Sequence, residues 1–190
     1  MEVEKIIDKP YLTLKQHTKK GIKRINVSPN VAVLEENKKR NYIKYGISYG
    51  STPVGFVALI NKAYGVWVDY IENFDPDKFS GLGKIADQLE VEHCLNRGLK
   101  EFSVLSDAIP SSLAFHYKRG KRFDYILNAK ENINLKEKYG TFNMNVIIEQ
   151  MLKKNTFPDK WDIGTVPMYM PKDLIKKYID IIAKFPLLKR

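Results

Sequence analysis

Two glycines stand close together in the stretch Lys78-Phe79-Ser80-Gly81-Leu82-Gly83, directly before a run with helical spacing. The first turn of a helix leaves backbone N–H groups unpaired and carries partial positive charge. A loop without bulky side chains lets a phosphate group approach those N–H groups closely. The hydroxyl of Ser80 and the amines of Lys78 and Lys84 add donors and positive charge. The stretch therefore predicts a binding site for a pyrophosphate group.

Two well-known phosphate motifs are excluded at this position. The dinucleotide fingerprint G-x-G-x-x-G needs a third glycine where Ala86 stands, and no early strand begins the unit. The P-loop needs the pattern G-x-x-x-x-G-K-[ST], which is absent. A bare G-x-G before a helix is a weak motif, so the surrounding elements have to decide its role.

The chain before the loop predicts an antiparallel sheet. Residues 41–50, 54–60 and 66–74 are rich in Tyr, Ile and Val, and short turns with Gly, Pro or Asn separate them. A further strand is predicted within residues 10–16. Residues 30–40 are polar and predict helical structure.

The period of the apolar residues changes at Leu82. The apolar positions Leu82, Ile85, Ala86 and Leu89 have helical spacing, and the helix is expected to end near Arg97-Gly98. A strand parallel to the one before the helix then completes a βαβ unit. The remaining predicted elements are the strand 99–107, the helix 111–120, the strands 122–129 and 141–148, and helices over 149–190 that the segment 155–171 separates.

Composition limits the classes of protein to which the chain can belong. The 190 residues suit one domain, and 44% hydrophobic content is enough for a core. The net charge of +10 favours polyanionic or phosphate-bearing partners. The single cysteine, Cys94, excludes an intramolecular disulfide, and we expect a reducing cytoplasm. No run approaches the about 20 apolar residues of a membrane span, and the N-terminus does not read as a signal peptide.

This series of elements, with its glycine loop, resembles the GNAT superfamily of N-acetyltransferases. The family's acetyl-CoA loop reads Arg/Gln-x-x-Gly-x-Gly/Ala, and residues 78–83 match both glycines, with Lys78 in place of Arg or Gln. The later family segment ends in Tyr, Gly and Phe. Here Tyr117 and Phe123 stand near those positions, but Gly120 comes one place early and Phe123 one place late. The resemblance covers about residues 40–150.

The resemblance implies an α/β fold of the α+β type. Its central sheet is mixed and mostly antiparallel, splays at a parallel strand pair and is flanked by helices. We expect an acetyltransferase domain over residues 1–150, with its core at about 40–150, and a C-terminal helical extension over 151–190 that packs on the same domain.

The resemblance also implies acetyl-CoA as the cofactor. The strand before the loop would line the pantetheine arm with Glu72, Asn73 and Phe74, and the loop amides would hold the pyrophosphate. The implied cofactor-binding residues are Asn73, Phe74, Lys78, Phe79, Ser80, Gly81, Leu82, Gly83 and Lys84. In the family, an uncharged amine attacks the thioester directly.

Direct transfer leaves two proton transfers for the protein to assist. Tyr117 resembles the family tyrosine that protonates the leaving sulfur, and its alternative role is packing under the second helix. The base is open among Glu72, Asp69 and Asp75, and we favour Glu72, directly or through water. In an alternating strand Asp69 and Glu72 face opposite sides unless a bulge intervenes.

Other reactive side chains have structural interpretations that we favour. Cys94 and His93 fall on the buried stripe of the helix, so we expect a packing cysteine and a satisfied buried histidine. His116 neighbours Tyr117 and is a weaker candidate for cofactor contact. The pattern H-E-x-x-H is absent, and we infer no metal.

The acceptor is left open as an amine-bearing small molecule, a peptide or an aminoacyl group. We expect no membrane partner and either a monomer or a homodimer, and nucleic acid remains an open partner. The alternative function is a catalytically inactive GNAT-fold module that binds RNA or a protein. The amphipathic C-terminal helix can pack on the core, cover the acceptor cleft or form a dimer seam, and packing on the same chain is favoured.

Overall fold

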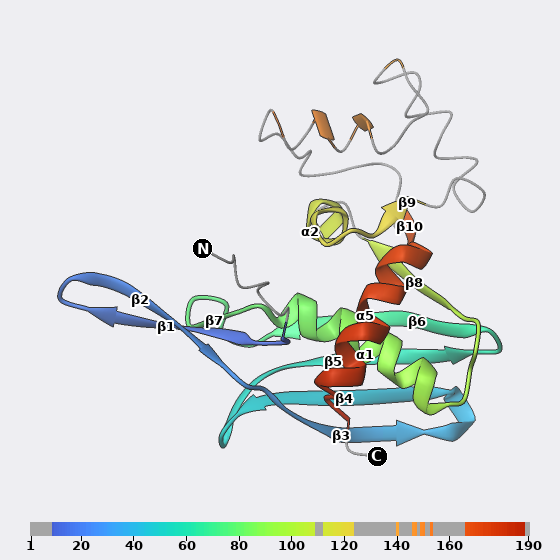
Figure 1. The fold of residues 1–190 in the computed structure, drawn as a ribbon, viewed down its shortest axis with the longest axis horizontal. Coiled ribbons are helices and arrows are strands. Elements are labelled where there is room, and N and C mark those ends of the chain that lie inside the picture. The colour runs from blue at the N-terminus through green and yellow to red at the C-terminus, as the bar shows by residue number, and fades with distance from the viewer. Residues whose placement is uncertain are drawn as a thin grey trace, which may run out of the picture. The chain divides into compact units, whose positions relative to one another are not determined.

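The computed structural model describes residues 9–108, 112–123, 140, 146–147, 149–150, 153 and 166–188. It shows the mixed α/β class that the sequence predicts, with more of the described residues in strands than in helices (Figure 1). The chain divides into two compact units, residues 1–102 with 175–190 and residues 103–174. Among the described residues, no helix combines the length and the apolar character that crossing a bilayer requires.

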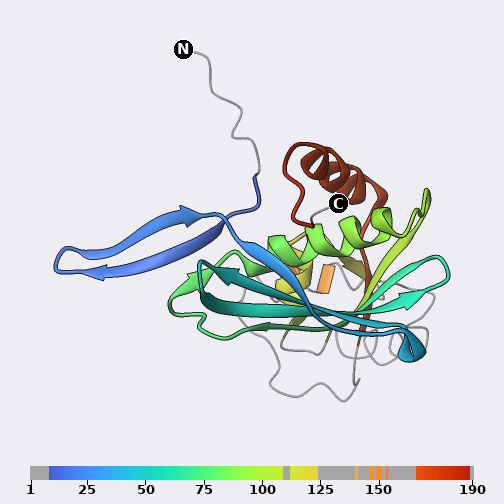
Figure 2. The same ribbon diagram turned by 90° about the horizontal axis from the view of Figure 1, so that it is seen from below.

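A small sheet of three strands begins the first unit. The strands are β1 (Leu12–Thr18), β2 (Gly21–Val27) and β7 (Phe79–Ser80), in the order β2-β1-β7. β1 and β2 form a tight hairpin, and the strand predicted within residues 10–16 is confirmed as β1. Figure 2 shows this hairpin as a ribbon that extends away from the strands β3–β6 of the same unit.

The predicted antiparallel meander is confirmed. It consists of β3 (Asn30–Asn37), the 3-10 turn η1 (Lys38–Arg40), β4 (Tyr42–Tyr49), β5 (Thr52–Lys62) and β6 (Gly65–Asn73). The helix predicted over residues 30–40 is wrong, because residues 30–37 form an edge strand beside β4. Only η1 is helical. The β-branched residues Val31 and Val33 alternate along this strand, and pairing with β4 decides against the helical propensity of its charged end.

A β-bulge interrupts β6 at Asp69. Val68 lies opposite Leu59, and Tyr70 lies opposite Ala58, so Asp69 is the extra residue. The alternation that would separate Asp69 from Glu72 is therefore broken at this point, as one extra residue changes which face the following side chains occupy.

One face of the meander is covered by the helix α1 (Leu82–Asn96). Figure 2 shows α1 along this face, and the buried side chains beneath it are those of Ile43, Tyr45, Ile47, Val57 and Leu59. The predicted helix is confirmed, with Arg97 at its C-cap and Gly98 in the left-handed region at φ 76°. Arg97 ties this end to the β5–β6 turn, as it donates to the carbonyls of Gly65 (2.6 Å) and Lys62 (2.9 Å).

His93 of α1 is the satisfied buried histidine that the sequence predicts. Its Nδ1 accepts from the Tyr45 hydroxyl (2.7 Å), and its Nε2 donates to the amide oxygen of Asn61 (2.6 Å). Burial, and then the nearby Arg97 guanidinium, lower its pKa from 6.5 to about 4. The ring is therefore neutral, and its two hydrogen bonds connect α1 to β4 and β5.

The C-terminal helix α5 (Lys172–Lys184) and the residues after it pack against α1 within the first unit. The Tyr178 hydroxyl donates to Asp87 (3.2 Å), and Gln88 donates to the carbonyl of Phe185 (2.7 Å). The buried Glu92 carboxylate accepts from the N–H groups of Leu187 and Leu188, each at 2.9 Å at its closest. The described part of this segment therefore packs against α1. The division into a domain over residues 1–150 and an extension over 151–190 stays a prediction.

The second unit contains β8 (Ser103–Ala108), α2 (Leu113–Lys118), β9 (Arg122–Phe123) and β10 (Val166–Tyr169). β10 pairs antiparallel with both β8 and β9, although its sequence had been assigned to a connection between helices. The strand predicted over 141–148 is wrong at residues 146 and 147, which are helical. The rest of that prediction, residues 124–129 and most of 151–165 lie outside the described residues. The parallel pairing expected for β8 stays a prediction.

Candidate functional site

The loop between β6 and α1 is held by its own side chains. The Asp75 carboxylate accepts from the N–H of Lys78 (2.9 Å), and the Asp75 carbonyl accepts from the N–H of Phe79 (2.8 Å). The Asn73 amide donates to the carbonyl of Phe79 (3.0 Å) and accepts from the N–H of Asp75 (3.1 Å). The side chain of Asn73 therefore stabilises the loop. The N–H of the buried Phe79 is already hydrogen-bonded, so it does not bind a ligand.

Gly81 meets two demands at once. Its φ of 92° lies in the left-handed region, and a Cβ built on it would come within 2.8 Å of the carbonyl oxygen of Tyr11. The residues before Gly81 pair with β1, with Ser80 opposite Thr13. Close approach of the N-terminal segment thus accounts for this glycine without any ligand. Sequence reasoning missed the contact because no local pattern links residues so far apart.

The N-terminus of α1 has unsatisfied donors. Gly81 is its N-cap, no side chain caps it, and its first turn holds no acidic residue. Lys84 donates its N–H to the Gly81 carbonyl (3.1 Å), whereas in this described loop no backbone bond uses the N–H groups of Gly81, Leu82 or Gly83. Three successive donors at the positive end of a helix of 15 residues can bind a phosphate group.

Three lysines from distant parts of the chain surround this end of α1. Lys9, Lys84 and Lys177 line one small pocket of about 50 Å³, together with Gln88 and Tyr178. Only Lys84 was among the residues predicted from the sequence. Lys9 comes from the N-terminal segment and Lys177 from α5, and neither belongs to a motif, so only the fold reveals that they add to the positive potential here.

The predicted pantetheine-lining residues lie where β6 leaves the meander. Glu72 is half-buried opposite Phe56, on the face of the sheet that carries Tyr70. The Phe74 side chain is 50% exposed, its ring centroid lies 5.9 Å from that of Phe56, and its N–H donates to the carbonyl of Val54 (2.9 Å). Lys44 places its amine 3.7 Å from the centre of the Phe56 ring. An aromatic surface with one cation and one carboxylate therefore follows the end of β6.

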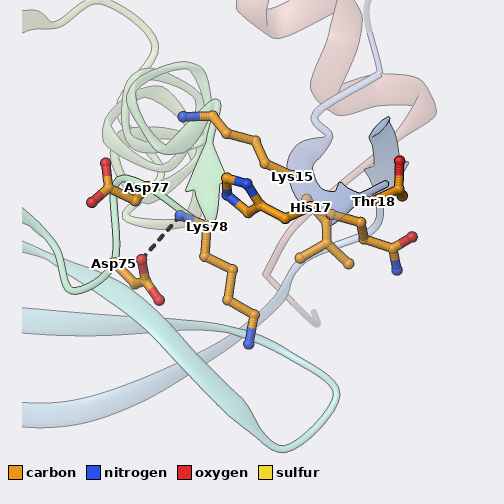
Figure 3. A pocket seen from close by; sticks show the side chains of 8 residues that line it. Lys15, His17, Thr18, Asp75, Asp77 and Lys78 are labelled. Atoms are coloured by element: carbon orange, nitrogen blue, oxygen red, sulfur yellow. Dashed lines mark hydrogen bonds between the residues drawn. The ribbon is translucent and has the colours of Figure 1, made fainter. Parts of the chain in front are cut away.

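A second and larger pocket lies between this loop and β1 (Figure 3). It has a volume of about 640 Å³ and is lined by Leu14–Thr18 of β1 and by Asp75, Asp77 and Lys78. Figure 3 shows His17 projecting from β1 toward the loop that carries the two aspartates. Carboxylates, amines and an imidazole share this pocket, so it favours no single sign of charge.

Tyr117 lies on α2 in the second unit. Its hydroxyl donates to the Glu149 carboxylate (2.7 Å), and the Arg122 guanidinium lies 4.6 Å from the centre of its ring. Its neighbour His116 is buried, and its pKa is lowered to about 3 by burial and then by Lys121 and Arg119. The loop residues 78–84 lie together in the first unit, whereas Tyr117 belongs to the other unit.

Cys94 is fully buried on α1, as the sequence predicts. Burial raises the pKa of its thiol from 9.0 to about 12. The reactive thiolate is therefore not populated at neutral pH, which fits a packing role.

Comparison with known proteins gives structural likenesses at low sequence identity. No family model and no curated protein matches the chain. An acyl-CoA N-acyltransferase from Pseudomonas aeruginosa has a TM-score of 0.40 and 10% sequence identity, over 68% of this chain and 68% of that chain. A protein of unknown function from Aquifex aeolicus VF5 has a TM-score of 0.29 and 11% identity, over 86% and 88% of the two chains. Both TM-scores are low, so neither likeness assigns an activity to this chain.

Proposed function

We propose that the protein is an acyl-CoA-dependent N-acyltransferase of the GNAT type, which moves an acetyl group from acetyl-CoA to a primary amine. The observation that carries the proposal is the uncapped start of α1, where no backbone bond among the described residues uses the N–H groups of Gly81, Leu82 and Gly83. Exposed Lys78 and Lys84 flank these donors. Such a site has the donors and the charge that a diphosphate requires.

The residues present fit the diphosphate with one revision. Phe79 and Lys84 donate their N–H groups within the loop. The backbone N–H groups that can bind the diphosphate are therefore those of Gly81, Leu82 and Gly83. Ser80, Lys78 and Lys84 contribute side chains in this proposal, and Lys9 and Lys177 extend the positive field. Glu72 and Phe74 border the pantetheine arm, and Asn73 acts only by fixing the loop.

When bound, acetyl-CoA supplies a thioester, whose acyl carbon–sulfur bond breaks as the new carbon–nitrogen bond forms. Glu72 takes the proton that the attacking amine loses, directly or through a water molecule. Tyr117 gives a proton to the departing thiolate. Its single hydroxyl proton, which is donated to the Glu149 carboxylate in the structure, must turn toward the sulfur for this transfer. In this proposal residues 1–150 form the catalytic domain, and residues 151–190 form an extension.

Calorimetric titration with acetyl-CoA and with CoA tests the site. The unmodified protein should bind both, and Lys84→Glu should weaken binding of both at least tenfold, because it replaces a cation at the donors with an anion. Lys100→Glu is the matched control, as Lys100 is an exposed lysine beyond the other end of α1 and should bind like the parent. No binding by the parent, or equal losses in both variants, would overturn the proposed site.

A thiol-release assay then tests the reaction. Acetyl-CoA is incubated with a panel of primary amines, which should include amino acids, peptides with free N-termini and polyamines. Amine-dependent release of free CoA thiol supports transfer. Cofactor binding without release for any amine would refute transfer to primary amines while leaving the site intact.

A further inference from the structure

The β1–β2 ribbon carries charge of only one sign. Residues 12–27 include no Asp or Glu, and their cations are Lys15, Lys19, Lys20, Lys23 and Arg24. Every residue from Gln16 to Arg24 is exposed. Only the root of the ribbon is anchored, by buried Leu12 and Val27 and by the pairing of β1 with β7. The distal half therefore contributes little to a core, and its composition is free to serve another purpose.

The register places like charges against each other. Lys15 lies directly opposite Arg24, and no acidic residue of the ribbon lies between them. The Lys15 amine donates to the carbonyl oxygen of Pro76 (2.9 Å). Like charges directly opposite each other on two strands destabilise the pair. An exposed two-stranded ribbon is only marginally stable to begin with. The cost of this arrangement would be offset where an anionic partner lies along the ribbon.

The cations occupy both faces and the tip. Lys15 and Arg24 share one face, Lys23 lies on the other, and Lys19 and Lys20 form the turn. The acidic residues Asp75 and Asp77 share a pocket with Leu14–Thr18 of β1 (Figure 3). None of Lys19, Lys20, Lys23 and Arg24 lines that pocket. A ribbon that is cationic on both faces fits between two walls of negative charge, and the major groove of B-form DNA admits a two-stranded β-ribbon between its phosphate backbones.

We propose that the distal half of the β1–β2 ribbon, residues 16–24, binds the phosphate backbone of a nucleic acid. The geometry favours insertion into the major groove of duplex DNA, because the major groove of A-form RNA is too narrow for side chains to read. Ile22, whose side chain is 51% exposed, is the one large apolar residue of this half, so contacts are mainly electrostatic. Residues 16–18 line a pocket that Lys78 of the proposed CoA loop also lines, whereas Lys19, Lys20 and Lys23 do not line it.

Fluorescence anisotropy with a labelled DNA duplex, an RNA hairpin and a single strand, at several salt concentrations, tests the proposal. The variant K19S/K20S/K23S removes three charges from the ribbon. The control K38S/K39S/R40S removes three from the exposed turn η1, so both variants carry a net charge of 10 − 3 = +7. The ribbon variant should lose at least tenfold in affinity, and its slope of log affinity against log salt should be shallower by about 2 to 3. The control should keep most of the affinity.

The outcomes separate the sources of negative charge. Ribbon-dependent binding of duplex DNA supports groove insertion, and ribbon-dependent binding of the RNA or the single strand supports backbone recognition without it. Equal losses in the two variants would show a general effect of net charge and overturn the proposal. Stronger ribbon-dependent binding to vesicles of phosphatidylserine and phosphatidylcholine, or no binding to any nucleic acid at low salt, would also overturn it. Retained titration by acetyl-CoA in both variants shows that the proposed acyltransferase site is unaffected.

Discussion

Acid should destabilise this protein through His93, and the structure sets the size of the effect. The neutral ring accepts from Tyr45 and donates to Asn61, and its burial lowers the pKa from 6.5 to about 4. The folded state therefore binds a proton less readily than the unfolded chain does. The stabilisation is fully present above about pH 6.5 and is lost progressively as the pH falls toward 4.

The magnitude follows from this difference in proton affinity. Each tenfold difference is worth about 1.4 kcal/mol, so the full difference is about 3 kcal/mol. Between pH 7 and pH 4.5, at which most but not all of the effect has appeared, His93 should cost about 2 kcal/mol of the free energy of unfolding.

Urea unfolding of the parent and of His93→Gln at the two pH values measures this term. The variant has no titrating ring at this position, so its loss between pH 7 and pH 4.5 should be smaller than that of the parent by about 2 kcal/mol. The comparison uses the change in the free energy of unfolding between the two pH values. A variant that is already less stable than the parent at pH 7 can therefore still be compared with it. His116, which is buried and also has a lowered pKa, is present in both proteins and cancels.

His17→Gln is the matched control, because His17 is exposed on the ribbon. It should lose as much stability in acid as the parent. If His93→Gln and the parent lose the same amount between the two pH values, His93 is not the buried neutral group described above, and the reasoning fails.

Three further substitutions test the loop, the C-terminal segment and the second unit. Gly81→Ala should lower the free energy of unfolding, measured in urea, by about 1 kcal/mol or more beyond the loss that Gly98→Ala causes. Both glycines have positive φ, but only Gly81 lies against a carbonyl oxygen. Equal losses in the two variants would refute the contact. Glu92→Gln should destabilise the protein by about 1 to 3 kcal/mol and speed amide exchange at the last described residues, because the carboxylate binds their N–H groups; unchanged exchange would contradict this anchor. Tyr117→Phe should slow thiol release at least tenfold with unchanged CoA affinity, and parental turnover would exclude Tyr117 as the acid.

Much of the fold follows from local patterns. Alternating β-branched and aromatic residues predicted β4, β5 and β6, and the change to helical spacing at Leu82 predicted α1 with its C-terminal glycine. These patterns are reliable because a strand or helix that buries one face must repeat its apolar residues with the period of that face. The histidine on the buried stripe was interpreted correctly for the same reason.

The errors arose where pairing across the chain outweighs local preference. Residues 30–37 form a strand because β4 offers an edge, and β10 forms because β8 and β9 lie on either side of it. The bulge at Asp69 depends on register against β5, which no single-strand pattern contains.

By itself, the sequence determined that a helix follows a glycine loop between lysines, since residue type and spacing are local. Only the tertiary structure decided that β1 claims the space beside Gly81, that Asn73 is bound to the loop, and that Lys9 and Lys177 come to the start of α1. The physical reason is that a free N–H group is a local property of the backbone. What surrounds such a group depends on segments that are distant along the chain.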